Sequence, residues 1–301
     1  MDFVELGRTG VRLPRIGLGT WQYKGGVEPL RKGVELGACL IDTAESYGTE
    51  EIVGQAISGM RDRIFLATKV SPQHFRGPDL IRAAENSLRR LKTDHIDLYQ
   101  LHYPSPVVPL EETMAAMEGL VEAGKVRFIG VSNFWLADLK RAQGCLSKYR
   151  IVSNQMPYSL VDRTIEFGLM HYCQEAQITI LAYSPLAHNM HDIVKNDRRG
   201  ALLRVAASTG RTEAQVALNW CLSRGGVIAI PKANSIEHTA DNCQASDWRL
   251  SSEQIRLLEK GIRSRGRVEF ALRRTARRIL PEAWISLGKN VVEWWLQPKN
   301  T

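Results

Sequence analysis

The sequence predicts an α/β protein built as a (β/α)8 TIM barrel over residues 1–262. Short apolar runs recur eight times, amphipathic segments lie between them, and polar residues end nearly every run. Eight strands alternating with helices over roughly 230 residues fit this barrel, which typically has about 250 residues. Composition alone leaves an open doubly wound sheet as the alternative.

The strands are expected where β-branched and apolar residues cluster, as in a parallel sheet covered on both faces. In chain order these runs are residues 15–21, 38–44, 64–70, 95–102, 126–133, 151–157, 178–185 and 226–233. Helices are expected between them, because several of these segments open with Pro, Thr or Glu and close at Gly. They include residues 28–37, 77–91, 109–124, 136–146, 164–176 and 212–225.

The N-terminal segment "FVELGRTGVRLPRIGLG" places a polar turn, "GRTG", between two short β-like runs. Such a turn favours a β-hairpin ahead of the first barrel strand. We expect this hairpin to close one end of the barrel.

Composition restricts the class of protein. The chain has 301 residues, of which 44% are hydrophobic and 24% charged, as in ordinary globular proteins. No run of 18 apolar residues occurs and the N-terminus lacks the apolar stretch of a signal peptide, so a cytoplasmic protein is expected. Five cysteines without a CxxC pair indicate buried free thiols and no zinc site.

Residues 263–301 differ from the rest of the chain. They hold nine Lys and Arg residues against three acidic ones, which accounts for most of the net charge of +8. Val268, Leu272, Ala276 and Ile279 recur at helical spacing, so we expect a basic, partly helical C-terminal tail. Packing on the barrel or on a partner subunit is favoured, giving a monomer or a homo-oligomer. A membrane surface or nucleic acid is the less favoured partner.

Chemistry in a barrel of this kind lies at the carboxyl ends of its strands. Asp42, Lys69 and His102 end three consecutive strands, and Tyr47 lies just beyond the first of them. Asp42 can hold Lys69 by an ion pair, and the Lys69 ammonium favours ionisation of the Tyr47 phenol. His102 can orient a carbonyl oxygen held against Tyr47. These four residues form a candidate proton-transfer set.

The motifs "IDTAESYG", "FLATKV", "LYQLH", "GVSNF", "NQMPYS", "YSPL" and "IPKANSIEHTADN" occur in this order, and with them residues 3–262 resemble the aldo-keto reductases. The resemblance implies a barrel enzyme that reduces aldehydes or ketones with NAD(P)H and lacks a Rossmann fold. It further implies that Tyr47 gives the proton to oxygen and that Asp42, Lys69 and His102 complete the catalytic tetrad.

The resemblance also implies a cofactor site, with NADPH favoured and NADH possible. Ser132, Asn133 and Gln155 match the carboxamide ligands and Tyr183 the stacking ring, while Lys232 and His238 lie in the segment that grips the adenosine phosphate. His238 stands where the family often has arginine, which weakens the expected preference for NADPH. The expected cofactor residues are Gly19, Thr20, Trp21, Asp42, Ser132, Asn133, Gln155, Tyr183, Ser184, Leu186, Lys232, Ala233, Asn234, His238, Asp241 and Asn242.

The expected substrate is a small carbonyl compound. Its contacts are expected from Trp21, Tyr47, His102, Tyr103 and Trp135. The segment "HNMHD" at 188–192 offers two histidines but no fourth ligand, so we interpret it as a polar loop and expect no metal. No nucleic acid partner is expected.

Two other functions remain open from the residues alone. Lys69 at a strand end is also compatible with a Schiff-base aldolase. The second alternative is a non-enzymatic nucleotide sensor or regulatory subunit that contacts a partner through its basic tail.

Overall fold

The computed structural model of the chain describes residues 1–264. Its first element is the expected hairpin, in which strands β1 (Phe3–Glu5) and β2 (Arg12–Pro14) pair antiparallel. The Leu6 amide donates to the Val11 carbonyl at 2.8 Å and closes the turn. The prediction of an N-terminal hairpin is confirmed.

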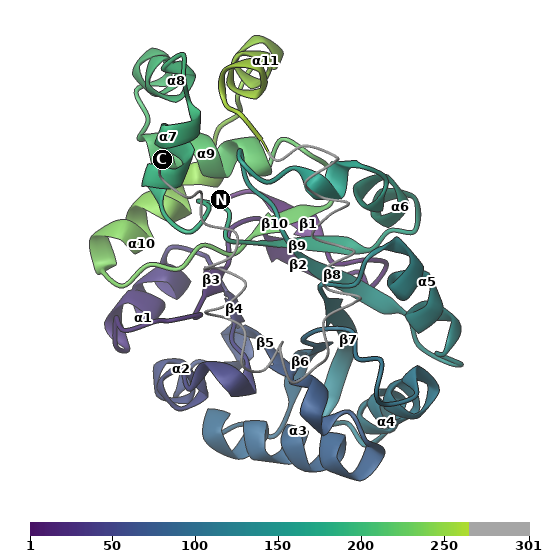
Figure 1. The fold of residues 1–301 in the computed structure, drawn as a ribbon. Coiled ribbons are helices and arrows are strands. Elements are labelled where there is room, and N and C mark those ends of the chain that lie inside the picture. Colours follow the sequence, from purple (N-terminus) through teal and green to yellow (C-terminus); the bar gives the residue numbers. More distant parts are fainter. Residues whose placement is uncertain (265–301) are drawn as a thin grey trace, which may run out of the picture. The chain divides into compact units, whose positions relative to one another are not determined.

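Eight parallel strands follow, paired in the order β10-β9-β8-β7-β6-β5-β4-β3 (Figure 1). They are β3 (Leu18–Gly19), β4 (Leu40–Asp42), β5 (Phe65–Val70), β6 (Ile96–Leu101), β7 (Val126–Ser132), β8 (Ile151–Pro157), β9 (Thr179–Tyr183) and β10 (Val227–Ala229). Each lies within one of the apolar runs of the sequence, so the predicted strand positions are confirmed. Consecutive strands are neighbours, as βα units wound in one direction require.

The first and last strands meet and close the barrel. Ile16 and Ala229 form a parallel bridge, and the Gly19 amide donates to the Pro231 carbonyl at 3.0 Å. This approach requires a glycine, because a Cβ on Gly19 would lie 2.6 Å from the Ile230 carbonyl oxygen. The closure excludes the open doubly wound sheet.

Helices surround the strands (Figure 1). They are α1 (Glu28–Glu35), α2 (Glu50–Ile57), α3 (Gly77–Leu91), α4 (Leu110–Glu122), α5 (Leu136–Gly144), α6 (Leu169–Glu175), α7 (Met190–Asn196), α8 (Ala201–Thr209), α9 (Glu213–Cys221), α10 (Ile236–Cys243) and α11 (Ser252–Gly261). The short 3-10 helices are η1 (Glu45–Tyr47), η2 (Arg61–Arg63), η3 (Pro72–His74), η4 (Thr164–Glu166) and η5 (Gln244–Ser246). The helix expected from residue 164 is divided at Gly168, whose φ of 112° interrupts it.

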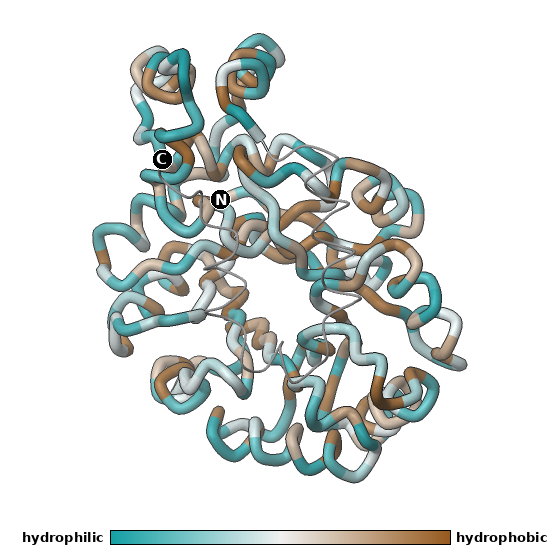
Figure 2. Tube along the Cα trace, in the orientation of Figure 1, coloured by the Kyte–Doolittle hydropathy of each residue, from teal (hydrophilic) through white to brown (hydrophobic). Residues whose placement is uncertain are grey.

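The core has an inner and an outer part. Inside the barrel, Leu40, Phe65 and Leu98 from the first halves of their strands pack with Leu6 and Leu13 of the hairpin. The outer faces of the strands pack against the helices, and hydrophobic residues run along the strands in Figure 2. Because the hairpin fills the end where the strands begin, the opposite, carboxyl end is left for chemistry.

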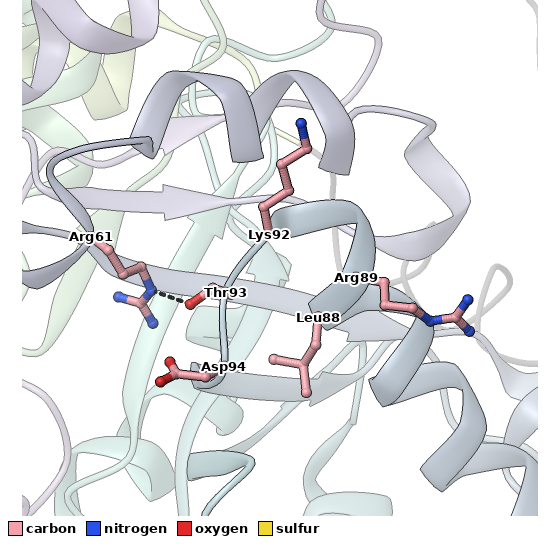
Figure 3. Close-up of a pocket in the computed structure, with 6 residues that line it drawn as sticks. All are labelled: Arg61, Leu88, Arg89, Lys92, Thr93 and Asp94. Carbon is pink, nitrogen blue, oxygen red and sulfur yellow. Dashed lines mark hydrogen bonds between the residues drawn. The ribbon is translucent and has the colours of Figure 1, made fainter.

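A shallow depression lies where β6 begins, lined by Arg61, Leu88, Arg89, Lys92, Thr93 and Asp94 (Figure 3). Arg61 Nε donates to Thr93 Oγ1 at 2.9 Å, and another nitrogen of Arg61 donates to Asp97 Oδ2 at 2.7 Å. These bonds tie η2 to the loop that leads into β6 and to β6 itself. The depression is therefore part of the structural support and lies at the barrel end opposite the carboxyl edge.

The expected basic tail lies outside the described residues from residue 265 on, so its helical character stays a prediction. Within residues 1–264, no helix is long and apolar enough to cross a membrane.

Candidate functional site

Polar side chains meet at the carboxyl ends of three neighbouring strands. Asp42 ends β4, Lys69 is the last residue but one of β5, and His102 directly follows β6. Strand β4 pairs with β5, and β5 pairs with β6. The barrel thus brings together the residues that the sequence places at consecutive strand ends.

Asp42 and Lys69 form a buried ion pair. Lys69 Nζ donates to Asp42 Oδ2 at 2.7 Å and to the Thr43 carbonyl at 2.8 Å, and it lies 3.4 Å from Tyr47 Oη. The side chains of Lys69 and Asp42 are 0% and 3% exposed, a burial that requires pairing and hydrogen bonding. A Schiff base needs an uncommitted amine, so these three contacts argue against the aldolase alternative.

Tyr47 approaches Lys69 from the turn after β4. It ends η1 and is followed by Gly48, whose φ of 67° is the left-handed conformation that favours glycine. The Lys69 ammonium lies 4.7 Å from the centre of the Tyr47 ring. Glu45, in the same turn, accepts a hydrogen bond from the Ser71 amide at 2.6 Å. The turn that carries Tyr47 is therefore fastened to the loop after β5.

Burial controls the pKa values of Tyr47 and Lys69. It raises the pKa of the Tyr47 phenol above its ordinary value, and the Asp42 carboxylate raises it further. It lowers the pKa of Lys69, although Asp42 acts in the opposite direction. The sequence predicts that Lys69 lowers the pKa of Tyr47 and favours the phenolate. This does not occur, because desolvation raises the pKa by more than the charge of Lys69, which is already paired with Asp42, lowers it. Tyr47 is a neutral phenol at neutral pH, the form that donates a proton.

His102 lies beside the phenol. Its ring is edge-on to that of Tyr47, with centroids 5.5 Å apart and planes at 72°. The Tyr103 ring stacks on the imidazole at 4.7 Å, and Ser46 Oγ lies 3.5 Å from His102 Nδ1. These contacts hold the imidazole where it and the phenol can approach the same carbonyl oxygen.

A second polar cluster lies at the ends of β7, β8 and β9. Ser132 Oγ donates to the Gln155 carbonyl at 3.1 Å, and Asn133 Nδ2 donates to the His102 carbonyl at 3.0 Å. Tyr183 Oη donates to Asn133 Oδ1 at 2.9 Å. Asn133 has a φ of 65°, which asparagine tolerates better than most residues. The expected carboxamide ligands thus form one network with His102.

The loops after β3 and β9 carry the next expected cofactor residues. Thr20 is buried and its Oγ1 donates to the Asp42 carbonyl at 3.0 Å. Ser184 has a φ of 48°, and its carbonyl accepts from the Ala187 amide at 2.9 Å, so the chain turns sharply after β9. Leu186, in this turn, packs partly against the core.

Residues 232–242 follow β10 and continue into α10. Ser235 caps this helix, and its Oγ accepts from the His238 amide at 3.2 Å. The side chains of Lys232 and His238 are exposed. They lie at the amino end of α10, where the helix dipole favours an anion.

The remaining residues of this segment have structural contacts. Asn234 Oδ1 accepts from the Lys24 amide at 3.0 Å, which joins the loop after β3 to the segment. The Asp241 carboxylate accepts from Thr212 Oγ1 at 3.0 Å, and Asn242 is buried. Ala233 is half-buried.

Three aromatic residues were expected to line the substrate site. Trp21 and Tyr103 are 38% and 37% exposed, so both present an aromatic surface to solvent. Trp135 packs partly against the core at the start of α5. No group of three His, Cys, Asp or Glu side chains in residues 1–264 is placed to hold a metal ion.

Sequence reasoning does not find Gln100. This residue lies on β6, two positions before His102, and its Nε2 donates to Asp42 Oδ1 at 3.1 Å. Residues two apart on a strand point to the same face, so a glutamine within the apolar run 95–102 is the signal that the sequence offers.

Comparisons with known proteins agree with this geometry. A model of the Aldo/keto reductase family matches residues 15–263. Methylglyoxal reductase YeaE of Escherichia coli is 42% identical over 263 residues, which cover 83% of this chain and 91% of the relative. Methylglyoxal reductase DkgB of Salmonella typhimurium is 32% identical over 251 residues, which cover 80% and 90%.

Solved structures give the same result. An aldo-keto reductase from Klebsiella pneumoniae in complex with NADPH is 40% identical, with a TM-score of 0.80, covering 88% of this chain and 96% of that one. The thermostable aldo-keto reductase Tm1743 is 41% identical, with a TM-score of 0.81, covering 86% and 99%. The chain belongs to the aldo/keto reductase family and is an NAD(P)H-dependent oxidoreductase, so it is not a non-enzymatic sensor.

Proposed function

We propose that the chain is an NADPH-dependent reductase of small aldehydes or ketones in which Tyr47 protonates the carbonyl oxygen. The observation that carries this proposal is the position of Lys69 Nζ, 2.7 Å from Asp42 Oδ2 and 3.4 Å from Tyr47 Oη. When bound, the dinucleotide supplies the hydride. The Lys69 ammonium lies where negative charge develops as the Tyr47 proton leaves, and Asp42 keeps it there.

Ser132, Asn133 and Gln155 fit the carboxamide of the cofactor. The Gln155 amide nitrogen donates to Asp42 Oδ1 at 2.7 Å, and no residue in the described part of the chain donates to Gln155 Oε1. That oxygen is therefore suited to accept from a carboxamide NH2. Tyr183 is proposed to stack on the nicotinamide, and the loops at Gly19, Thr20 and Trp21 and at Ser184 and Leu186 to flank the rest of the dinucleotide.

The proposed dinucleotide is NADPH. Lys232 offers an ammonium and His238 an imidazole beside the amino end of α10, which suits a phosphate monoester. The Klebsiella pneumoniae relative is solved in complex with NADPH. NADH remains a weaker second cofactor, since an imidazole grips a phosphate less firmly than a guanidinium.

The proposed substrate is a short 2-oxoaldehyde such as methylglyoxal. Two relatives are named methylglyoxal reductases. In this chain His102 and Tyr47 offer polar contacts to a carbonyl oxygen, and the exposed faces of Trp21 and Tyr103 provide apolar surface for a small acyl group.

A carbonyl panel tests the substrate class. We expect kcat/KM, followed by loss of NADPH absorbance, to be at least tenfold higher for methylglyoxal than for bulky aromatic aldehydes. One methylene in an apolar pocket changes selectivity by roughly tenfold or more. Rapid turnover of the bulky aldehydes with none of methylglyoxal would overturn the substrate class.

The proposal also covers the C-terminal tail and the cellular location of the protein. A protein of this composition is proposed to act in the cytoplasm. Residues 263–301 are proposed to pack on the barrel or on a second subunit. Arg263, beside the described end of the chain, donates its amide to the Asn196 carbonyl at 3.0 Å, so the tail begins next to the end of α7. Truncation after residue 262 tests the role of the tail, because an unchanged oligomeric state together with an unchanged substrate preference would contradict it.

A further inference from the structure

Asp42 is held by two glutamines as well as by Lys69. Gln100 Nε2 donates to Asp42 Oδ1 at 3.1 Å from β6, and Gln155 Nε2 donates to the same oxygen at 2.7 Å from β8. Gln155 Nε2 also lies 3.4 Å from Gln100 Oε1. The two carboxylate oxygens of Asp42 therefore have different partners. Oδ2 accepts from Lys69, and Oδ1 accepts from the side-chain amides of Gln100 and Gln155, here called the amide pair.

The orientation of the Gln100 amide follows from its surroundings. The side chain is 0% exposed. Turning the amide over would place its oxygen against the Asp42 carboxylate and its nitrogen against the donating Gln155, which would break both contacts at once. Gly130 leaves room for it, because a Cβ there would lie 3.0 Å from Gln100 Cγ.

We infer that Gln100 is a positioning residue of the reductase site. It fixes Asp42 Oδ1 and orients Gln155, and through Asp42 it sets the place of Lys69 Nζ against Tyr47. Gln155 is the proposed ligand of the cofactor carboxamide. The amide pair therefore also links the proposed nicotinamide-binding site to Asp42 and Lys69. This inference rests on the proposed function of the site.

Replacing Gln100 should change kcat and the Kd for NADPH but not the KM for the carbonyl substrate. Gln100→Met keeps the length of the side chain and removes both hydrogen bonds. We expect kcat to fall about tenfold or more, as for the loss of one hydrogen bond to a charged group, with the carbonyl KM within twofold. The Kd for NADPH, measured by fluorescence titration without substrate, should rise several-fold because Gln155 loses its orientation.

Gln100→Glu separates positioning from packing. Glutamate has the shape of glutamine, but only its protonated form donates to Asp42, and burial next to a second carboxylate raises the pKa of such an acid. We expect kcat of this variant to increase relative to wild type as pH falls from 8 to 5.5. Gln100→Met should stay low across that range.

Tyr99→Phe is the matched control. Tyr99 is the preceding residue on β6, it is buried, and its hydroxyl has no hydrogen-bond partner among residues 1–264. We expect its kcat, pH profile and Kd for NADPH to match wild type. Thermal unfolding of every variant shows whether it is folded, and Gln100→Leu takes the place of Gln100→Met if that variant is not.

The outcomes separate this inference from the proposed function. A folded Gln100→Met variant with the wild-type kcat and NADPH affinity would overturn the positioning role, whatever the role of Tyr47. Full turnover by Tyr47→Phe would instead overturn the proton donor, while low-pH rescue of Gln100→Glu would still place Gln100 in the active site.

Discussion

At the scale of single residues, Lys69 carries a charge with no exposed surface and is stable only through its contacts with Asp42, Thr43 and Tyr47. The sequence predicts the four residues of this group because each follows or ends an apolar run. It does not predict that burial raises the pKa of Tyr47, because the depth of the turn after β4 depends on packing across strands. It also misses Gln100, since a single glutamine in an apolar strand acquires meaning only once β4, β6 and β8 face one another across the barrel.

The buried pair makes a prediction about stability. Lys69→Met leaves the Asp42 carboxylate buried without its cation, so we expect the free energy of unfolding to fall by roughly 3–5 kcal/mol. The double variant Asp42→Asn/Lys69→Met removes both charges and should regain most of that loss in chemical denaturation. Neither variant should turn over substrate. A double variant as unstable as the single one would show that the charges do not interact as a pair.

At the scale of elements, all eight strands and the hairpin follow from the spacing of apolar runs, because β-branched runs bounded by Gly and Pro have few alternatives. Helix boundaries were less predictable. The segment 164–176 splits into η4 and α6 because Gly168 adopts a φ of 112°, which the amphipathic pattern does not show. Likewise the sequence predicts a phosphate clamp at 232–242, while the ties of Asn234 to Lys24 and of Asp241 to Thr212 need the assembled fold.

A substitution in helix α10 tests which residues contact the cofactor phosphate. His238 is exposed in its first turn, three residues after the cap Ser235. His238→Arg places a permanent positive charge and a bidentate hydrogen-bond donor beside the proposed phosphate site. The Kd for NADPH should therefore fall about tenfold. The Kd for NADH should stay within twofold, since NADH lacks that phosphate. An equal gain for both cofactors would show that residue 238 does not contact the 2′-phosphate.

At the scale of the whole molecule, the barrel places buried thiols on several helices. Burial raises the pKa of Cys173 on α6 to about 12 and that of Cys243 on α10 to about 11, from an ordinary 9.0. In the unfolded chain both thiols lose their protons near pH 9, while the folded chain keeps them. The stability that these two groups provide is therefore complete below pH 9 and is lost as pH rises toward 11 and 12.

This linkage predicts a pH-dependent difference between two proteins. Relative to its stability at pH 8, wild type should lose roughly 1.4 kcal/mol per thiol by pH 10. Cys173→Ala/Cys243→Ala should lose correspondingly less, as measured by urea unfolding at each pH. Lys69, whose pKa burial lowers, acts in the opposite direction but equally in both proteins. Parallel curves above pH 9 would contradict the assignment.

The Tyr47→Phe variant tests whether Tyr47 donates the proton in carbonyl reduction. The measurement is single-turnover oxidation of NADPH with methylglyoxal, together with the Kd for NADPH determined by fluorescence on the same protein. Because a positioned general acid contributes on the order of 100- to 10,000-fold, we expect the rate to fall within that range. The Kd should remain within about twofold. A variant that binds NADPH normally and reduces methylglyoxal at the wild-type rate would show that Tyr47 is not the proton donor.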